Sequence, residues 1–235
     1  MTRIARRHIL LLLAALASLA ALTPLRAEDA VLVPPPPAEE SQARDAQASG
    51  GLRSVVLAGG CFWGVQGVFQ RVKGVTQAVS GYAGGARGTA HYETVSGGRT
   101  GHAESVKVTY DPAVIGLGDL LRIYFSVAHD PTQLNRQGPD QGSQYRSEIF
   151  FADAAQEKFA RDYIARIDAA HVFAEPVATR LEALKEFYPA EGYHQDYLTL
   201  HPEQPYIVAY DAPKLIALRR LFPDRYREAP ALVSP

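Results

Sequence analysis

Cysteine is nearly absent from this sequence: Cys61 is the single one among 235 residues. An intrachain disulfide is therefore excluded, although disulfides persist in the oxidising compartments that exported proteins usually meet. Free cysteine is among the most buried residue types, so one interpretation of Cys61 is an inert thiol in the core. The other is a reactive thiol, and the neighbouring sequence has to decide between them.

The sequence also lacks a surplus of positive charge. Its 24 lysines and arginines are balanced by 25 aspartates and glutamates, and no basic run follows the first few residues. Without such a field to hold phosphates, nucleic acid is not an expected partner. The seven histidines have no paired-ligand spacing such as H-E-x-x-H, so no catalytic metal is predicted.

Residues 1–27 have the pattern of an export signal. Arginines at positions 3, 6 and 7 precede an apolar run over residues 9–22, and cleavage is predicted after Ala27. The run is shorter than the ~20 residues of a membrane-spanning helix, which favours removal over a retained anchor. We therefore expect an exported protein, periplasmic or extracellular, with the general secretory and twin-arginine routes both open.

The rest of the chain divides into a tether, one domain and a tail. Residues 28–52 contain four consecutive prolines followed by Ala, Glu, Gln, Ser and Gly, a composition too poor in apolar residues to order itself. The folded domain is predicted to span residues 53–226, with no internal repeat, and residues 227–235 form a C-terminal tail. The overall 47% of hydrophobic residues suits a single core.

Cys61 is predicted to lie at a turn between a strand and a helix. The apolar run at residues 55–58 is typical of a buried strand, two glycines end it, and apolar positions then recur with helical spacing from residue 62 to 72. The unpaired N–H groups and the dipole at a helix start lower the pKa of a thiol. This location favours a reactive thiolate.

Trp63 lies almost opposite the apolar stripe of that predicted helix. It either lines a pocket or packs under a second layer as part of the core. Phe62 is nearer the stripe and suits both purposes.

Glu104 lies on the apolar face of a second predicted strand. It shares that face with Val106, Val108 and Tyr110, whereas a merely solvated glutamate would be expected on the other face. Burial raises the pKa of a carboxyl group, so a neutral acid would be available near neutral pH. Glu104 is thus a candidate general acid; a salt bridge to an arginine, or escape to water at the strand end, is the alternative.

Seven short blocks, in order, resemble the A-type methionine sulfoxide reductases, that is, peptide-methionine (S)-S-oxide reductases. Together they span most of the predicted domain, and their number and order make coincidence a poor explanation. The blocks are Gly-Cys-Phe-Trp-Gly at 60–64, Gly-Tyr-Ala-Gly-Gly at 81–85, Thr-Gly-His-Ala-Glu at 100–104, His-Asp-Pro-Thr-Gln at 129–133, Asn-Arg-Gln-Gly at 135–138, Gln-Tyr-Arg-Ser at 144–147 and Tyr-His-Gln-Asp-Tyr at 193–197.

The resemblance implies an activity, a site and a fold. The activity is reduction of methionine S-sulfoxide, free or in proteins. The fold is an α+β, ferredoxin-like sandwich around which the chain from Phe187 onward wraps; strand-like stretches at residues 55–58, 75–82, 104–110 and 145–151 and helical ones at 62–72, 117–128 and 154–170 agree with an α+β pattern. The implied catalytic residues are Cys61 as nucleophile, Glu104 as acid, and Tyr92 and Tyr145 as hydroxyl donors to the sulfoxide oxygen. The implied substrate-binding residues are Phe62 and Trp63 around the methyl group, with Asp140, His194 and Tyr197.

The chain departs from the family pattern where many relatives carry a recycling thiol. Residues 201–208 contain no cysteine, and Ser96 stands in a stretch where some relatives have a second one. Ala90 and His91 also precede Tyr92 in place of the usual Pro-Thr. We therefore expect a Cys61 sulfenic acid that an external thiol resolves, either a thioredoxin-like protein or a small thiol, in a monomer with no bound cofactor.

Three other interpretations of Cys61 remain at this point. One is a redox-sensing domain without turnover, and another is a cysteine hydrolase with His102 or His194 as base. The third, a thiol peroxidase, fits less well because the cysteine lacks the proline and threonine setting of that class. The identity of the reductant and the preference between free and protein-bound substrate stay open.

Overall fold

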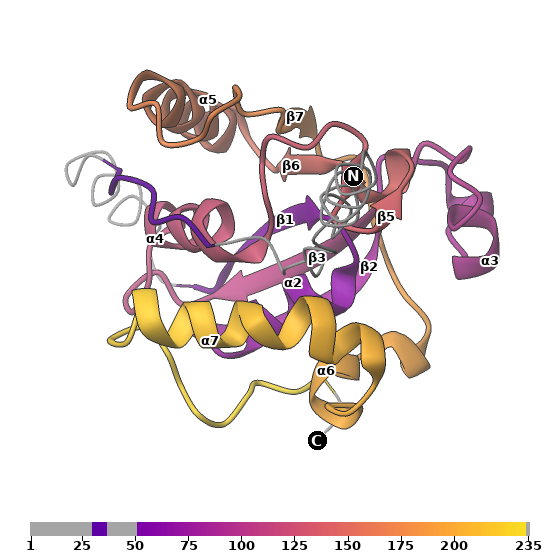
Figure 1. The fold of residues 1–235 in the computed structure, drawn as a ribbon. Coiled ribbons are helices and arrows are strands. Elements are labelled where there is room, and N and C mark those ends of the chain that lie inside the picture. The colour runs from indigo at the N-terminus through magenta and orange to yellow at the C-terminus, as the bar shows by residue number, and fades with distance from the viewer. Residues whose placement is uncertain (1–29, 37–50, 234–235) are drawn as a thin grey trace, which may run out of the picture.

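A six-stranded mixed sheet forms the centre of the protein, of which the computed structural model describes residues 30–36 and 51–233 (Figure 1). The strand order is β7–β6–β1–β3–β2–β8. All neighbours pair antiparallel except β6 and β7, which are parallel. The strands are β1 (Arg53–Gly59), β2 (Val75–Ala83), β3 (Ala103–Tyr110), β6 (Ser147–Phe151), β7 (Arg180–Ala183) and β8 (Phe187–Pro189); β4 (Arg136–Gln137) and β5 (Asp140–Gln141) form a separate pair.

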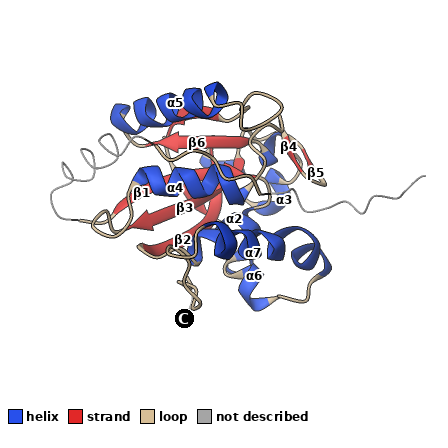
Figure 2. Ribbon diagram, turned by 60° about the vertical axis from the view of Figure 1, so that its left-hand side comes forward, coloured by secondary structure: helices blue, strands red, loops and turns tan. Residues whose placement is uncertain are grey.

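The longer helices share one apolar core on one face of this sheet, and α7 packs against α2 (Figures 1 and 2). The helices are α2 (Phe62–Gln70), α3 (Tyr92–Val95), α4 (Leu117–Ile123), α5 (Ala154–Ala169), α6 (Tyr197–Leu200) and α7 (Ala212–Leu221). Two π-helical turns, which are wider than an α-helix, adjoin these helices. Tyr124–Ala128 follows α4, and Ile207–Asp211 precedes α7. Within residues 30–36 and 51–233, none of the helices has the length and apolar content that crossing a bilayer requires.

Alternation along β1 assigns its side chains to the two faces of the sheet. Val55 and Leu57 enter the large core under the helices, whereas Val56 and Ala58 join a smaller cluster on the opposite face. The apolar stripe predicted for the helix after Cys61 is buried against the same large core. Because β1 and β3 pair in register, with Leu57 opposite Val106, the apolar face of β3 also points toward α2.

Two elements differ from the sequence-based prediction in the type of structure over part of their range. Tyr145 does not begin a strand but ends a short 3₁₀ turn, Ser143–Tyr145, and β6 starts at Ser147. The helix expected over residues 117–128 is α-helical only to Ile123 before it widens.

The tether predicted over residues 28–52 is wrong for residues 30–36, which pack on the domain. Val33 is fully buried, its N–H donates to Ser126 Oγ (3.1 Å), and its carbonyl oxygen accepts from Arg122 Nε (3.0 Å). Tyr163 donates its hydroxyl hydrogen to the carbonyl oxygen of Pro34. The buried Val33 side chain and these hydrogen bonds anchor the segment against α4, the turn after it and α5. The predicted export signal and the remaining tether lie outside the described residues.

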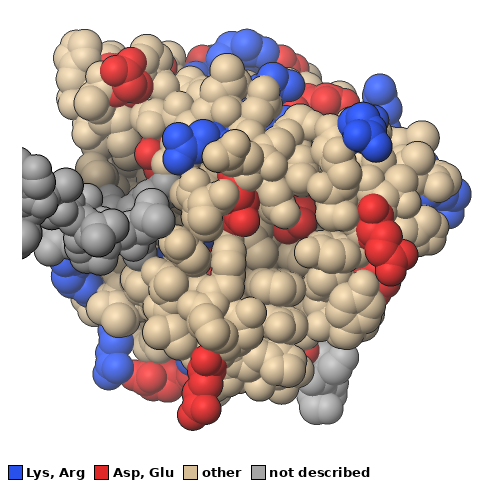
Figure 3. Space-filling view, turned by 45° about the vertical axis from the view of Figure 1, so that its right-hand side comes forward, with Lys and Arg blue, Asp and Glu red and all other residues tan. Residues whose placement is uncertain are grey.

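The predicted tail is also ordered as far as the structure describes it. Arg227 and Ala231 donate their N–H groups to the carbonyl oxygens of Arg71 and Gln70, both at 2.9 Å. Val233 N–H donates to the carboxylate of Asp196. The C-terminal residues thus run along the end of α2 instead of leaving the domain after residue 226. On the face shown in Figure 3, acidic and basic side chains are interspersed.

Candidate active site

Cys61 occupies the N-cap position of α2, directly after the turn that ends β1. Gly60 has a φ of +88°, and a Cβ atom there would lie 2.5 Å from Cγ of Gln137. The turn therefore requires glycine for two reasons, the left-handed backbone and the close approach of Gln137. This brings the thiol to the start of α2, where it is half-buried.

Glu104 lies beside Cys61. The side chain is buried, and Oε2 accepts a hydrogen bond from the N–H of Phe62, the residue after the cysteine (3.1 Å). Burial is the main cause that raises its pKa to about 8; the charges of Asp140 and Asp211 act in the same direction, while the Phe62 N–H opposes them. None of the ion pairs among the described residues involves Glu104. The group is mostly a neutral acid at pH 7.

The expectation that the helix start would lower the thiol pKa is wrong for this site. The pKa of Cys61 is raised well above its usual value, first by burial and then by the negative charges of Asp211 and of Glu104, which is ionised above its own pKa; of these two, Glu104 has the larger effect. The N–H of Trp63, at the helix start, does lower the pKa, but its effect is smaller. Desolvation and acidic neighbours outweigh the helix terminus here, so Cys61 is a thiol in the resting site.

An aromatic wall lies next to the thiol. Trp63 stacks on Tyr197 with ring centroids 3.8 Å apart, and its Nε1–H donates to His194 Nδ1 (3.2 Å). Phe62, which is buried, has its ring centroid 5.1 Å from that of His194. Trp63 itself is partly buried and packs against the core, so the core placement holds in part, and the pocket-lining placement stays a prediction.

The hydrogen bond from Trp63 fixes the tautomer of His194. Because Nδ1 accepts a hydrogen, the neutral ring carries its proton on Nε2. Burial lowers the pKa of His194, which favours this neutral form. Nε2 is buried and has no hydrogen-bond partner among the described residues, and the ring lies 4.4 Å from that of Tyr92. One donor is therefore left for a substrate.

Tyr92 and Tyr145 reach the same site from different elements. Tyr92 begins α3, where its N–H donates to Glu191 Oε1 (3.1 Å), and Tyr145 ends the 3₁₀ turn before β6. The pKa of each is raised by burial first and by Glu104 second. Both hydroxyls therefore remain protonated and able to donate near Glu104.

Three further residues at the site were not found from the sequence: Tyr206, Asp211 and Lys214. Tyr206 donates its hydroxyl hydrogen to Asp140 Oδ2, and its pKa is raised by burial and by the nearby Cys61. Asp211 is fully buried and pairs with Lys214 (3.1 Å). The available signal for Tyr206 was its position, because it is an aromatic residue in the stretch where relatives carry a recycling cysteine. No local pattern singles out Asp211.

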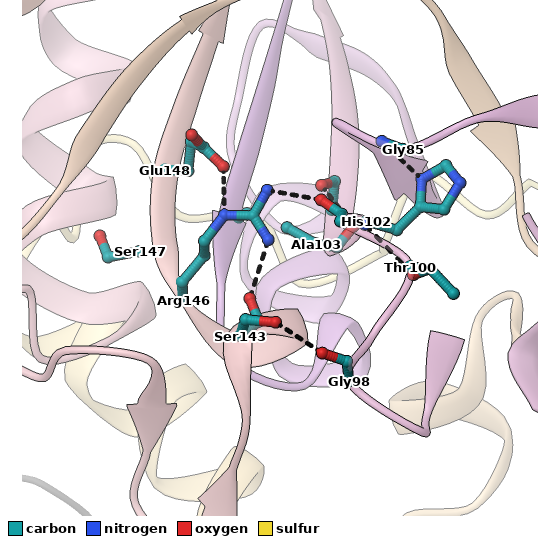
Figure 4. A network of polar contacts seen from close by, with 12 residues as sticks. Gly85, Gly98, Thr100, His102, Ala103, Ser143, Arg146, Ser147 and Glu148 are labelled. Atoms are coloured by element: carbon teal, nitrogen blue, oxygen red, sulfur yellow. Dashed lines mark hydrogen bonds and ion pairs between the residues drawn. The ribbon is translucent and has the colours of Figure 1, made fainter. Parts of the chain in front are cut away.

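A buried arginine ties together the segments that carry the acid and the second tyrosine (Figure 4). Arg146 donates from Nε to Glu148 Oε2 (2.5 Å) and from its terminal nitrogens to the carbonyl oxygens of Ser143 (2.8 Å) and Gly101 (3.0 Å). Gly101 precedes β3, which carries Glu104, and Ser143 begins the turn that ends at Tyr145. The arginine therefore holds the segment before β3 and the 3₁₀ turn next to each other.

His102, a candidate base in the hydrolase alternative, is committed to the backbone. Nδ1 accepts from the N–H of Gly85 (3.2 Å), and Nε2 bonds to the carbonyl oxygen of Ala86 (3.0 Å). Its ring thus has no free nitrogen for proton transfer to the thiol. Within the described part of the chain, no group of three or more metal-ligating side chains converges either.

Comparison with known proteins decides between the alternatives. Residues 53–225 match the sequence profile described as peptide methionine sulfoxide reductase. The chain belongs to this family. A peptide methionine sulfoxide reductase MsrA 2 of Mesorhizobium japonicum is 58% identical over 189 residues, covering 80% of this chain and 97% of the relative. One from Synechocystis is 47% identical over 177 residues, covering 75% and 83%.

Solved structures of methionine sulfoxide reductases have a similar fold. The reduced form of Mxr1 from Saccharomyces cerevisiae superposes with a TM-score of 0.59 at 33% identity, covering 68% of this chain and 91% of the yeast one. Methionine sulfoxide reductase A of Corynebacterium diphtheriae gives 0.55 at 32% identity, covering 67% and 79%. The protein is thus an oxidoreductase with a mixed α/β fold, and the hydrolase and non-catalytic alternatives are set aside.

In this methionine sulfoxide reductase, Trp63→Ala is expected to impair substrate binding more than folding. The ring stacks on Tyr197 and is only partly buried against the core. Its removal therefore takes away more of the proposed substrate-binding surface than of the core volume. We expect kcat/KM for the sulfoxide to fall about tenfold, a loss of ~1.4 kcal/mol, with a smaller change in the unfolding midpoint. Trp63→Phe, which keeps a ring, is the matched control. A large loss of stability at unchanged kcat/KM would assign Trp63 to the core instead.

Proposed function

We propose that the protein reduces methionine S-sulfoxide, free or in proteins, through a Cys61 sulfenic acid that an external thiol resolves. The observation that carries the proposal is the hydrogen bond from the backbone of Phe62 to Glu104, which holds a neutral acid next to the single thiol. A sulfoxide sulfur becomes electrophilic when its oxygen is protonated, so thiol and acid have to lie together.

In the first half-reaction, Glu104 gives its proton to the sulfoxide oxygen while the Cys61 sulfur attacks. Positive charge that develops on the substrate sulfur favours the thiolate, and the thiol proton passes to the Glu104 carboxylate. The attack forms an S–S bond between Cys61 and the substrate sulfur. This bond breaks as the hydroxyl oxygen passes from the substrate sulfur to Cys61, so one S–O bond is broken and one is formed. Methionine leaves reduced by two electrons, and Cys61 becomes a sulfenic acid, oxidised by two.

The remaining site residues orient the substrate. Tyr92 and Tyr145 donate hydroxyl hydrogen bonds to the oxygen, in a geometry that the fold fixes before the substrate arrives. Phe62 and Trp63 enclose the methyl group. The ring contacts of Phe62 with His194 and of Trp63 with Tyr197 support a role for these two residues at the edge of this pocket. The hydrogen bond from Tyr206 keeps Asp140 in its polar part.

In the second half-reaction, an external thiol has to restore the enzyme because Cys61 has no partner cysteine. The incoming sulfur forms a mixed disulfide and water leaves; a second thiol then releases the reduced enzyme and a disulfide product. No bound cofactor takes part in this scheme. A thioredoxin-like protein and a small thiol are both chemically competent.

We further propose an exported monomer with a ferredoxin-like core. The N-terminal arginines and apolar run support export. Support for the core comes from the strand order β6–β1–β3–β2, with α2 between β1 and β2 and α4 between β3 and β6. The chain from β8 onward, which ends along α2, supports a wrapping C-terminal segment.

A burst experiment without reductant tests the function. Excess methionine S-sulfoxide should release about one methionine per chain and then stop, because one thiol supplies one reducing event. A dimedone adduct should form on Cys61, and the R epimer, the control, should release none. Two methionines per chain, or equal release from both epimers, would contradict the scheme.

A further inference from the structure

A cavity of about 480 Å³ reaches Cys61 from a side that the proposed sulfoxide site does not use. Its walls come from the packed N-terminal segment, the turn after α4, the loop 173–175 and the start of α7. Ala30 and Val31 line one side, and Ala174 and Lys214 line others. Volumes of about 300–1,000 Å³ are typical of sites for small molecules.

The cavity and the proposed sulfoxide site have Cys61 in common. Cys61 and Tyr206 line the cavity, whereas the groups proposed to bind the sulfoxide oxygen do not: Glu104, Tyr92 and Tyr145 are all absent from its walls. The aromatic pair around the substrate methyl, Phe62 and Trp63, is absent as well. The lining of the cavity therefore differs from the set of groups proposed to bind the sulfoxide.

The geometry of displacement at sulfur requires the recycling thiol to approach Cys61 from a particular side. A thiolate attacks a sulfenic acid in line with the S–O bond, from the side away from the departing oxygen. That oxygen comes from the sulfoxide and is held by Glu104 and the two tyrosines, so the incoming thiol has to approach from a side without them. We propose that the cavity is the entry of the recycling thiol and that it takes a small zwitterionic thiol. This rests on the proposed sulfenic acid chemistry.

The lining determines the class of thiol. Arg136 supplies positive charge and Asp130 and Glu175 negative charge. The ammonium group of Lys214 is paired with Asp211, and burial lowers the pKa of His129 to about 3 and keeps it neutral. Charges of both signs suit a molecule with a carboxylate and an ammonium group, such as cysteine or a short cysteinyl peptide. A folded reductase domain does not fit a cavity of this size.

Recycling consumes two molecules of the small thiol. The thiol sulfur bonds to Cys61 sulfur, the S–O bond breaks, and the oxygen leaves as water with the thiol proton and its own. A second molecule of the same thiol attacks the mixed disulfide, is oxidised with the first to the small disulfide, and returns Cys61 to the thiol.

Ala174→Trp tests the entry. Ala174 is exposed on a loop and lines the cavity, so an indole there narrows the passage without entering the core. The enzyme alternates between the thiol and the sulfenic acid forms of Cys61. The kcat/KM for methionine S-sulfoxide therefore reports on the first half-reaction, and the kcat/KM for cysteine reports on the second. With cysteine as reductant, we expect kcat/KM for cysteine to fall about tenfold, while kcat/KM for methionine S-sulfoxide and the reductant-free burst stay unchanged. Ala165→Trp, on the exposed side of α5, is the control.

Arg136→Gln tests the charge. Arg136 is exposed, so folding should be unaffected. Recycling by cysteine should weaken more than recycling by uncharged 2-mercaptoethanol. If Ala174→Trp leaves kcat/KM for cysteine unchanged, the cavity is not the entry of the thiol. If it lowers only kcat/KM for methionine S-sulfoxide, the cavity holds the chain of the substrate, and the proposal is overturned as well. Faster recycling of wild type by thioredoxin than by cysteine, unaffected by Ala174→Trp, would also overturn it. A missing burst in wild type would instead refute the proposed function.

Discussion

Cys61→Ser is expected to release no methionine, either in a burst or in turnover with added thiol. A serine hydroxyl is a far weaker nucleophile than a thiolate at neutral pH. It also cannot accept the sulfoxide oxygen, because the product would be a peroxide instead of a sulfenic acid. The loss is therefore complete rather than partial.

Methionine released from the S epimer, with and without dithiothreitol, measures this effect. Ser96→Ala is a matched control, since Ser96 is exposed and its hydroxyl bonds only to the carbonyl oxygen of Glu93. The control should give one methionine per chain without reductant. Any burst from Cys61→Ser would show that another group receives the oxygen.

Glu104→Gln should lower the rate of the first half-reaction by a factor on the order of 10²–10⁴, the usual effect of removing a general acid. The amide oxygen can still accept from the N–H of Phe62, so the turn before α2 should keep its geometry. What the variant lacks is a proton to transfer. Single-turnover measurements with the S epimer isolate this step from recycling.

The pH dependence of that step provides a second measurement. Glu104 acts in its protonated form, and its pKa is raised to about 8. The wild-type rate should therefore be high below pH 8 and fall as pH rises through it, whereas the glutamine variant should lose this limb. Glu93→Gln, on the exposed side of α3, controls for removing one negative charge. An unchanged rate in Glu104→Gln would return Glu104 to a structural role.

Local pattern was sufficient where a site residue is fixed by its own element. The glycines and the apolar stripe predicted that Cys61 starts a helix, and strand alternation predicted that Glu104 is buried. Both follow from the period of a single helix or strand. The clustering of the two, however, depends on β1 and β3 being neighbours, which alternation alone does not specify.

Effects that depend on packing between distant segments could not be predicted in this way. Asp211 comes from a π-helical turn some 150 residues after the thiol, and only the folded chain brings its charge near Cys61. The direction of the thiol pKa shift was misjudged for this reason, since a helix start is visible in sequence and its surrounding carboxylates are not. Val33 was missed because composition averages over a segment, while one well-placed side chain can anchor it.

The acidic, buried surroundings of Cys61 have a consequence for the idle enzyme. Hydrogen peroxide oxidises thiolates far faster than thiols, and repeated attack leads to sulfinic acid, which is not reversed by simple thiols. With burial, Glu104 and Asp211 all raising the pKa of Cys61, the enzyme that awaits substrate holds its sulfur in the less reactive form. In the proposed first half-reaction the thiolate forms as the sulfoxide is attacked, so the conditions that damage methionine should oxidise the resting Cys61 only slowly.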